Sequence, residues 1–242
     1  MLFRTGSHNH NSQFLKQIVF SSFLLALSIC FAYLSKFMKV FPFLNISLSL
    51  TPIFLCFVLV NTKFTIIILI ARFLFEPLIL PNSSIDIEYL GSFIVLLAHI
   101  LFIAFYALFF HLFYFAIIKK YHKEQSQNHK ILITMISLIL TTIVATLVLS
   151  TINTFFTNLI YFKLLKITNT FSLAKTIEVY KNIKNYFAFG IDNYYGGSYL
   201  LYIVFNLLNY SINGFIVFNL IVTEIKTNFL TNFLKFDHHN HY

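Results

Sequence analysis

Charged residues are scarce in this chain of 242 residues: they make up 10% of it, and only eight of them are acidic. Hydrophobic residues make up 58%, and the mean hydropathy is +0.79. A soluble domain of this size needs a charged surface to stay dissolved, so this composition excludes one. Several stretches run about 18 residues or more without a charge, the length needed to cross a ~30 Å hydrocarbon core. We therefore expect a membrane protein with several spans.

Cysteine and the common catalytic signatures are also rare or missing. The two cysteines, Cys30 and Cys56, both lie in apolar runs, which argues against a disulfide framework. The sequence contains no HExxH, GxSxG or GxxxxGK[ST] motif and no pair of carboxylates with an obvious common site. Five histidines lie in the polar ends, where solvated tails are favoured over metal binding: His8, His10, His238, His239 and His241. No catalytic residue, metal site, cofactor or ATP-binding site is expected.

The basic residues cluster at the ends of apolar runs, so the net charge of +9 orients the chain in the membrane and does not indicate nucleic-acid binding. Continuous apolar runs favour helices over barrel strands. We expect six spans, at residues 17–35, 51–62, 64–80, 91–118, 131–160 and 199–225. The basic segment KKYHKEQSQNHK at 119–130 is expected in the cytoplasm under the positive-inside rule. The predicted fold class is all-α: a compact bundle of six transmembrane helices with N- and C-termini cytoplasmic.

No repeat or second domain is visible. A polar N-terminal tail (1–16) and a C-terminal tail (227–242) flank one membrane domain (17–226). The segment 161–198 is a long outer loop with five lysines, contrary to the charge rule, and loops of that length are usually functional or partly structured.

The last span carries asparagines that a lipid-facing helix would not tolerate. Asn206, Asn209 and Asn213 recur at steps of three and four residues, so they share one helix face. Moving an unpaired amide into hydrocarbon costs roughly 4–8 kcal/mol. This face must therefore meet polar partners.

Two other spans have faces of hydrogen-bonding and aromatic groups. They are Thr142, Thr146, Ser150, Asn153, Thr157 and Tyr161 in the fifth span, and Ser92, His99, Tyr106 and Phe113 in the fourth. Such groups either bond across helices, worth about 0.6 kcal/mol each, or converge on a cavity for a flat polar ligand. For any single one of these residues, packing between helices is the better interpretation. Because three spans carry such faces beside the Tyr- and Asn-rich segment 185–199, the faces together favour a ligand cavity.

Two further patterns leave alternatives open. Arg72 and Glu76 lie one turn apart in the third span and are either a functional site or a structural pair. The first span has small residues one turn apart, which let another helix approach closely, within the bundle or in a partner subunit. These are Ser22, Ala26, Ser28 and Ala32.

Three segments in order resemble the substrate-binding S components of energy-coupling factor (ECF) vitamin transporters, most of all the riboflavin type. They are FPFLNISLSLTPIFL (41–55), LVLSTINTFFTNLIY (147–161) and VFNLLN (204–209). The positions that match the family pattern are Pro52, Asn153, Tyr161, Phe205 and Asn206. The positions that depart from it are Leu159 and Val204 in place of proline, Asn209 in place of lysine, and Ser47 and Leu50 where acidic residues are frequent. The glycines expected after the second span are also absent.

The resemblance implies a bacterial cell-membrane subunit that captures a vitamin outside and docks on a transmembrane coupling subunit driven by two ATPase subunits. The implied substrate-binding residues are Asn206 and Asn153, followed by Asn209, Asn45, Tyr106 and Tyr161. Amides suit the donor and acceptor edge of a flavin, and aromatic rings suit its face. The implied contact with the coupling subunit is the set of small residues Ser22, Ala26, Ser28 and Ala32.

Other functions remain possible at this point. The same fold could serve a different vitamin or precursor. A membrane enzyme acting on lipids would have to use His99, His111 and the pair of Arg72 and Glu76. A non-catalytic assembly factor would use its polar faces only for helix packing.

Overall fold

The computed structural model describes residues 10–41, 44–79, 84–121, 127–187 and 189–234. Four long helices dominate it: α1 (His10–Ser35), α4 (Ile85–Tyr121), α5 (Gln127–Ile152) and α8 (Tyr194–Thr227). The shorter helices are α2 (Leu50–Leu55), α3 (Thr62–Ile79), α6 (Asn158–Leu164), α7 (Leu173–Phe187) and α9 (Phe229–Leu234). Two π-helical segments, η1 (Cys56–Val60) and η2 (Asn153–Thr157), and two short strands, β1 (Lys39–Phe41) and β2 (Leu44–Asn45), complete the fold. The predicted all-α class is confirmed.

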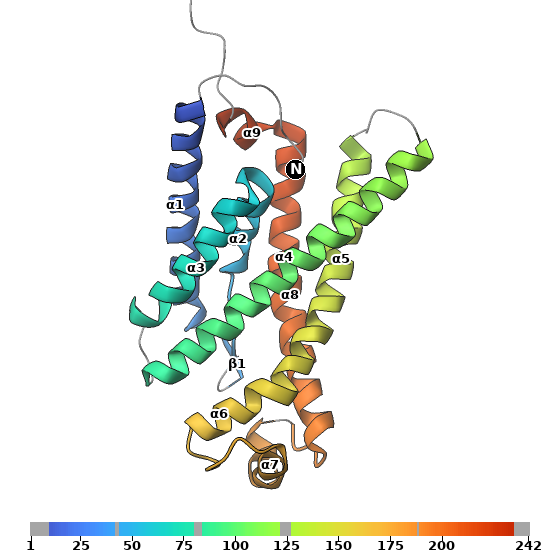
Figure 1. Ribbon diagram of the computed structural model, residues 1–242. Helices are drawn as coiled ribbons and strands as arrows, with labels where there is room; N and C mark the ends of the chain where they lie inside the picture. Colours follow the sequence, from blue (N-terminus) through green and yellow to red (C-terminus); the bar gives the residue numbers. More distant parts are fainter. Residues whose placement is uncertain (1–9, 42–43, 80–83, 122–126, 188, 235–242) are drawn as a thin grey trace, which may run out of the picture.

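Helix α5 packs against both α4 and α8, and α3 packs against both α1 and α4. In Figure 1, α1 and α3 lie on one side of the bundle, α5 lies on the other, and α4 crosses between them at a steep tilt. The amphipathic helix α7 lies across one end and α9 lies at the opposite end (Figure 1). We call these the α7 end and the α9 end. The tails 1–9 and 235–242 and residues 122–126 of the basic segment lie outside the described residues.

Four of the six expected spans are confirmed as helices long and apolar enough to cross a membrane: Gln13–Ser35, Ile85–Ala116, Gln127–Leu164 and Tyr194–Thr227. The third expected span is α3, which has 18 residues and includes Lys63, Arg72 and Glu76. The helical part of the second span, Leu50–Val60, is about 16 Å long at 1.5 Å per residue, roughly half of a hydrocarbon core. Six membrane-spanning helices are therefore not established.

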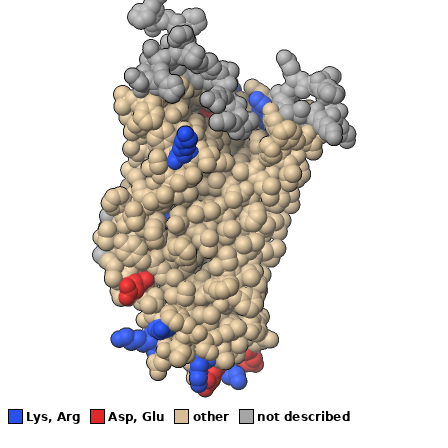
Figure 2. All heavy atoms as spheres, in the orientation of Figure 1, with Lys and Arg blue, Asp and Glu red and all other residues tan. Residues whose placement is uncertain are grey.

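The surface fits a chain embedded in a bilayer. In Figure 2, charged side chains gather at the α7 end, and the middle of the face shown is almost free of them. Large apolar side chains such as Phe23, Ile67, Phe156 and Phe215 are exposed on four different helices or helical segments. Hydrocarbon is the solvent that such a surface requires.

The second expected span, residues 51–62, is helical from Leu50 to Val60, and non-helical backbone precedes it. After the hairpin of β1 and β2, in which Lys39 pairs with Asn45, the chain continues without helix or strand structure as far as Ser49. We call residues 46–49 the extended segment. It runs from the hairpin at the α7 end into the bundle (Figure 1). Helix α2 then begins with Pro52 in its first turn, where the missing N–H leaves no intrahelical bond unmade.

The expected outer loop 161–198 contains α7. Leu173, Ile177 and Tyr180 recur at helical spacing, and they pack with Tyr194 of α8 in a small apolar cluster. The Tyr180 hydroxyl donates to the Ile191 carbonyl at 2.7 Å. The apolar face of α7 therefore packs against the bundle.

Aromatic rings fill the centre of the bundle. The ring of Phe54 in α2 meets Tyr106 of α4 edge-on, with centroids 4.7 Å apart. Phe102 of α4 stacks on Tyr210 of α8 at 5.0 Å. These contacts hold α2, α4 and α8 together and fix which face of α8 looks into the bundle.

Candidate functional site

The asparagine face of α8 holds the extended segment by its backbone. The Ser47 N–H donates to Asn209 Oδ1 at 2.9 Å, and Asn213 Nδ2 donates to the Ser47 carbonyl at 2.8 Å. The oxygen of the Asn213 amide accepts a bond from the Thr51 hydroxyl at 3.0 Å. From the other side, the Ser28 hydroxyl of α1 donates to the Ser49 carbonyl at 3.1 Å. Both polar groups of the Ser47 backbone are thereby bonded to one helix.

These bonds explain why a membrane helix carries the asparagines. Non-helical backbone at membrane depth has no water to bond with, so it needs partners inside the protein. Asn213 is fully buried, with an exposed fraction of 0%, in the middle of α8. Its side chain and that of Asn209 replace the ladder bonds that the extended segment lacks.

Polar side chains also line the contact between the antiparallel helices α5 and α8. Asn206 Nδ2 donates to Ser150 Oγ at 3.1 Å. About two turns further toward the α9 end, Gly214 lies against Thr142, whose hydroxyl would be 3.7 Å from an added Cβ. The polar faces predicted for these two spans therefore meet each other, and part of their bonding capacity is used in packing.

Asn153 begins the π-helical segment η2. Its side chain is 4% exposed, and its Oδ1 accepts a bond from Thr157 Oγ1 at 3.0 Å. Single-turn π-helical segments inside α-helices occur frequently at functional sites. Here the segment changes the register between α5 and α6, which turns the face of Asn153 relative to that of Ser150.

A buried polar cluster was missed by the sequence analysis. Asn158 Nδ2 donates to Ser198 Oγ at 2.9 Å and to the Tyr194 hydroxyl at 3.2 Å, and its Oδ1 accepts from Tyr202. Ser198 and Tyr194 in turn donate to the side chain and carbonyl of Thr154. Thr154 and Asn158 are four residues apart, so helical spacing could have revealed the pair. This cluster joins η2 and α6 to the first turns of α8.

The remaining predicted binding residues do not meet in one place. Asn45 ends β2 beside the extended segment, and its Oδ1 is buried without a hydrogen-bond partner among the described residues. Tyr161 in α6 lies near Gly91, whose added Cβ would be 3.5 Å from the tyrosine hydroxyl. Tyr106 lies 15 residues further along α4 than Gly91, about 22 Å away at helical rise. Tyr106 and Tyr161 are thus too far apart to share one small ligand.

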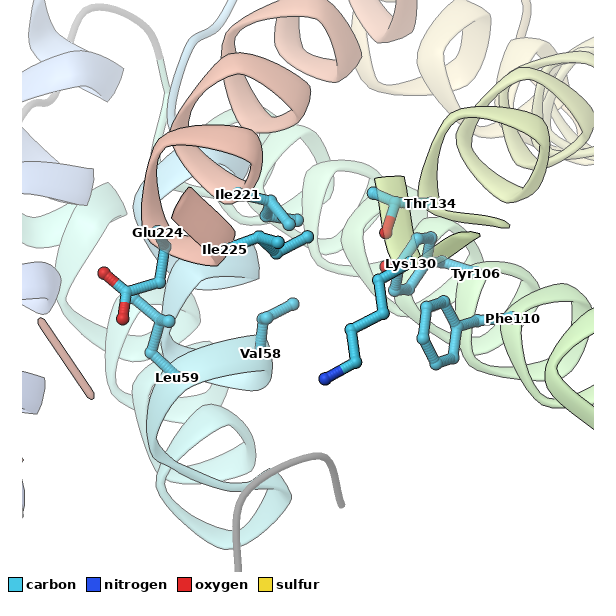
Figure 3. A pocket seen from close by; sticks show the side chains of 9 residues that line it. All are labelled: Val58, Leu59, Tyr106, Phe110, Lys130, Thr134, Ile221, Glu224 and Ile225. Carbon is cyan, nitrogen blue, oxygen red and sulfur yellow. The ribbon is translucent and has the colours of Figure 1, made fainter. Parts of the chain in front are cut away.

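Tyr106 instead lines a small cavity toward the α9 end (Figure 3). Its volume is about 30 Å³, room for about two water molecules, whereas sites for drug-sized ligands need roughly 300 Å³ or more. The lining residues are Val58, Leu59, Tyr106, Phe110, Lys130, Thr134, Ile221, Glu224 and Ile225. In Figure 3 the Lys130 side chain extends along one wall, and the Glu224 carboxylate points away from it. A vitamin does not fit this cavity without separation of the helices.

The small residues of α1 face two directions. Ser22 and Ala26 are exposed, whereas Ser28 and Ala32 are buried. Ser28 is used in the bond to the extended segment, so the exposed pair alone remains accessible to another subunit.

A group of ionisable residues lies on α3 and α4. Arg72 Nη2 is 2.9 Å from Glu76 Oε2 on the same helix. His99 of α4 is 4% exposed and is close enough to Arg72 for their charges to interact. His111 is exposed and lies 12 residues away on the same helix, about 18 Å along it, so the two histidines do not form one site.

The predicted amides lie on three elements near the junction of α8, the extended segment and α5. These amides are Asn45 of β2, Asn153 of η2, and Asn206 and Asn209 of α8. No protein-family model, curated protein or solved structure matches the chain.

Proposed function

We propose that this chain is the membrane-embedded substrate-binding subunit of an ECF-type importer and that riboflavin is its cargo. The observation that carries the proposal is the extended segment held inside the bundle by Asn209 and Asn213. Secondary transporters bind substrates where a membrane element is interrupted, because the freed polar groups and the room beside them can serve a ligand. The subunit would bind its cargo from outside and release it inward together with a coupling subunit and two ATPases.

Two amide oxygens at one level of the bundle support this assignment. Asn45 Oδ1 is buried without a partner among the described residues. The bond from Asn206 to Ser150 uses the amide nitrogen, which leaves its oxygen to accept a bond. Asn45 comes two residues before Ser47, and Asn206 comes three residues before Asn209, to which Ser47 is bonded. Both segments run from the α7 end toward the α9 end (Figure 1), so the two amides lie at a similar level. A ligand that donates N–H or O–H groups, as the flavin imide and ribityl chain do, would satisfy both oxygens.

Binding requires the extended segment to move. The bundle around it is close-packed, so the ligand would take the place of some of the bonds that now hold residues 46–49. Three bonds between distant side chains and its backbone hold the segment. They stabilise it less than the continuous backbone bonding of a helix would, and non-helical elements of this kind are the ones that move in conformational changes. In this proposal the chain has no catalytic residue.

The test is a titration of riboflavin into the purified chain in detergent, followed by quenching of flavin fluorescence. Saturable quenching at sub-micromolar ligand is expected. Replacement of Asn206 by leucine should weaken binding by about 1–3 kcal/mol, because a ligand donor loses its acceptor. Asn219→Leu is the matched control, since Asn219 is exposed on the same helix and donates to the Phe215 carbonyl.

Unchanged affinity in Asn206→Leu would remove this residue from the site. Absence of quenching by folded protein would remove flavin as the cargo, and a panel of other vitamins would follow. The rival function is a non-catalytic assembly factor, which the internal bonding of Asn209 and Asn213 also favours. A stable complex with a partner protein, together with no binding of any vitamin, would support the rival.

A further inference from the structure

Three ionisable side chains of α3 and α4 lie close together inside the bundle, on other helices than the asparagines of α8. Arg72 is 2% exposed and His99 is 4% exposed. Glu76 pairs with Arg72 at 2.9 Å and is 18% exposed. A charge in hydrocarbon is expensive, so ionisable residues at this depth usually mark functional sites.

Two nitrogen atoms of this group have unused bonding capacity. Arg72 Nε and His99 Nδ1 are both buried, and neither has a hydrogen-bond partner among the residues described. Glu76 Oε2 is likewise buried without a hydrogen bond among those residues, although it lies 2.9 Å from Arg72 Nη2. A guanidinium can only donate, so Arg72 Nε lacks an acceptor. His99 Nδ1 can donate to the same acceptor when it carries a proton. The ion pair with Glu76 leaves this side of the arginine open.

We propose that this cluster between α3 and α4 is a binding site for an oxyanion, a carboxylate or a phosphate group, held by Arg72 and His99. Oxygen acceptors with negative charge are the partners that an arginine fork binds most strongly. None of its residues belongs to the proposed vitamin site, so either proposal can fail without the other.

The charges already present in the cluster predict that anion binding depends on pH. Arg72 and Glu76 already neutralise each other, so an entering anion would leave a net negative charge at low dielectric unless a proton enters with it. His99 is the group that can take this proton. The other ionisable groups near it are Arg72 and Glu76 from α3, Tyr106 two turns along α4, and Tyr210 of α8, whose hydroxyl donates to the Ala98 carbonyl. The packed part of α5, residues 131–152, has no titratable side chain. Anion binding should therefore strengthen as the pH falls.

The experiment is calorimetric titration of the full chain in detergent with sodium acetate and with sodium phosphate, against sodium chloride at equal ionic strength. Two buffers of different ionisation enthalpy report the proton uptake. Arg72→Lys retains the charge opposite Glu76 but loses Nε, and should weaken binding by about tenfold or more. His99→Gln should abolish the pH dependence. His111→Gln, on the exposed side of the same helix, is the control and should behave as wild type.

Preference for acetate or for phosphate identifies the group, and either one supports the site. Failure of both probes to bind the wild-type chain saturably at millimolar concentration overturns the proposal. Equal binding by a folded Arg72→Lys variant also overturns it. If that variant does not fold, the titration of the wild-type chain in the two buffers still tests the proposal, because anion binding without proton uptake contradicts the role of His99.

Discussion

The side-chain amide of Asn213 bonds through both its nitrogen and its oxygen to residues near the start of α2. Asn206 and Asn209, on the same face of α8, each bond to a distant residue through one atom of the amide. The Asn213 nitrogen donates to the Ser47 carbonyl and its oxygen accepts from Thr51. Asn209 binds the Ser47 N–H, and Asn206 binds Ser150 of α5. Helical spacing predicted that these residues share a buried face. It could not separate packing from ligand binding, because an amide has the same chemistry in either role.

Asn213→Leu should destabilise the protein by about 1–3 kcal/mol, because the Ser47 carbonyl and the Thr51 hydroxyl would be left buried without partners. The free energy of unfolding in mixed detergent, followed by circular dichroism, measures this loss. Asn219→Leu makes the same change at an exposed position of α8 and should have little effect. Equal losses in the two variants would contradict the role given to Asn213.

At the scale of elements, apolar runs predicted the long helices well, because a span must bury nearly every side chain in hydrocarbon or protein. The short second span at 51–62 was also predicted closely, since the chain is helical from Leu50 to Val60. The bonds of Ser47 and Ser49 to Asn209 and Ser28 were not predicted, because they join residues far apart in the sequence. The long loop at 161–198 contains the helix α7, which the sequence did not predict although Leu173, Ile177 and Tyr180 have helical spacing. Its polar face obscured that pattern.

The short helix α9 depends on one side chain of α8. The Glu224 carboxylate accepts bonds from the Leu230 and Thr231 N–H groups at 2.9 and 2.8 Å, so it caps the first turn. Glu224→Ala should cost α9 about 1 kcal/mol, a typical value for a lost N-terminal cap.

Hydrogen exchange of the amides in residues 229–234 measures this effect and should become faster by about fivefold. Thr223→Val is the control, since Thr223 is exposed and donates to a carbonyl within its own helix. Unchanged exchange in Glu224→Ala would mean that packing on α1 and α8, not the cap, holds α9.

At the scale of the whole molecule, the helices end either at the α7 end of the bundle or toward the α9 end. The junction of η1 and α3 lies at the α9 end, and α7 lies at the other (Figure 1). The candidate binding residues were predicted only in part, because periodicity gives a helix face but not the rotation and offset of neighbouring helices. Tyr106 and Tyr161 show the consequence: each faces inward, yet they lie at different depths.

The orientation of the bundle in the membrane is the last prediction. The basic segment 119–130 and the positive-inside rule put the α9 end in the cytoplasm, in spite of the lysines on α7. In a background without Cys30 and Cys56, a membrane-impermeant maleimide should label Lys181→Cys in intact bacterial cells. It should label Lys63→Cys only after permeabilisation, because both side chains are exposed but lie at opposite ends. The reverse pattern would put α7 inside, and a vitamin captured from outside would then have to enter past α9.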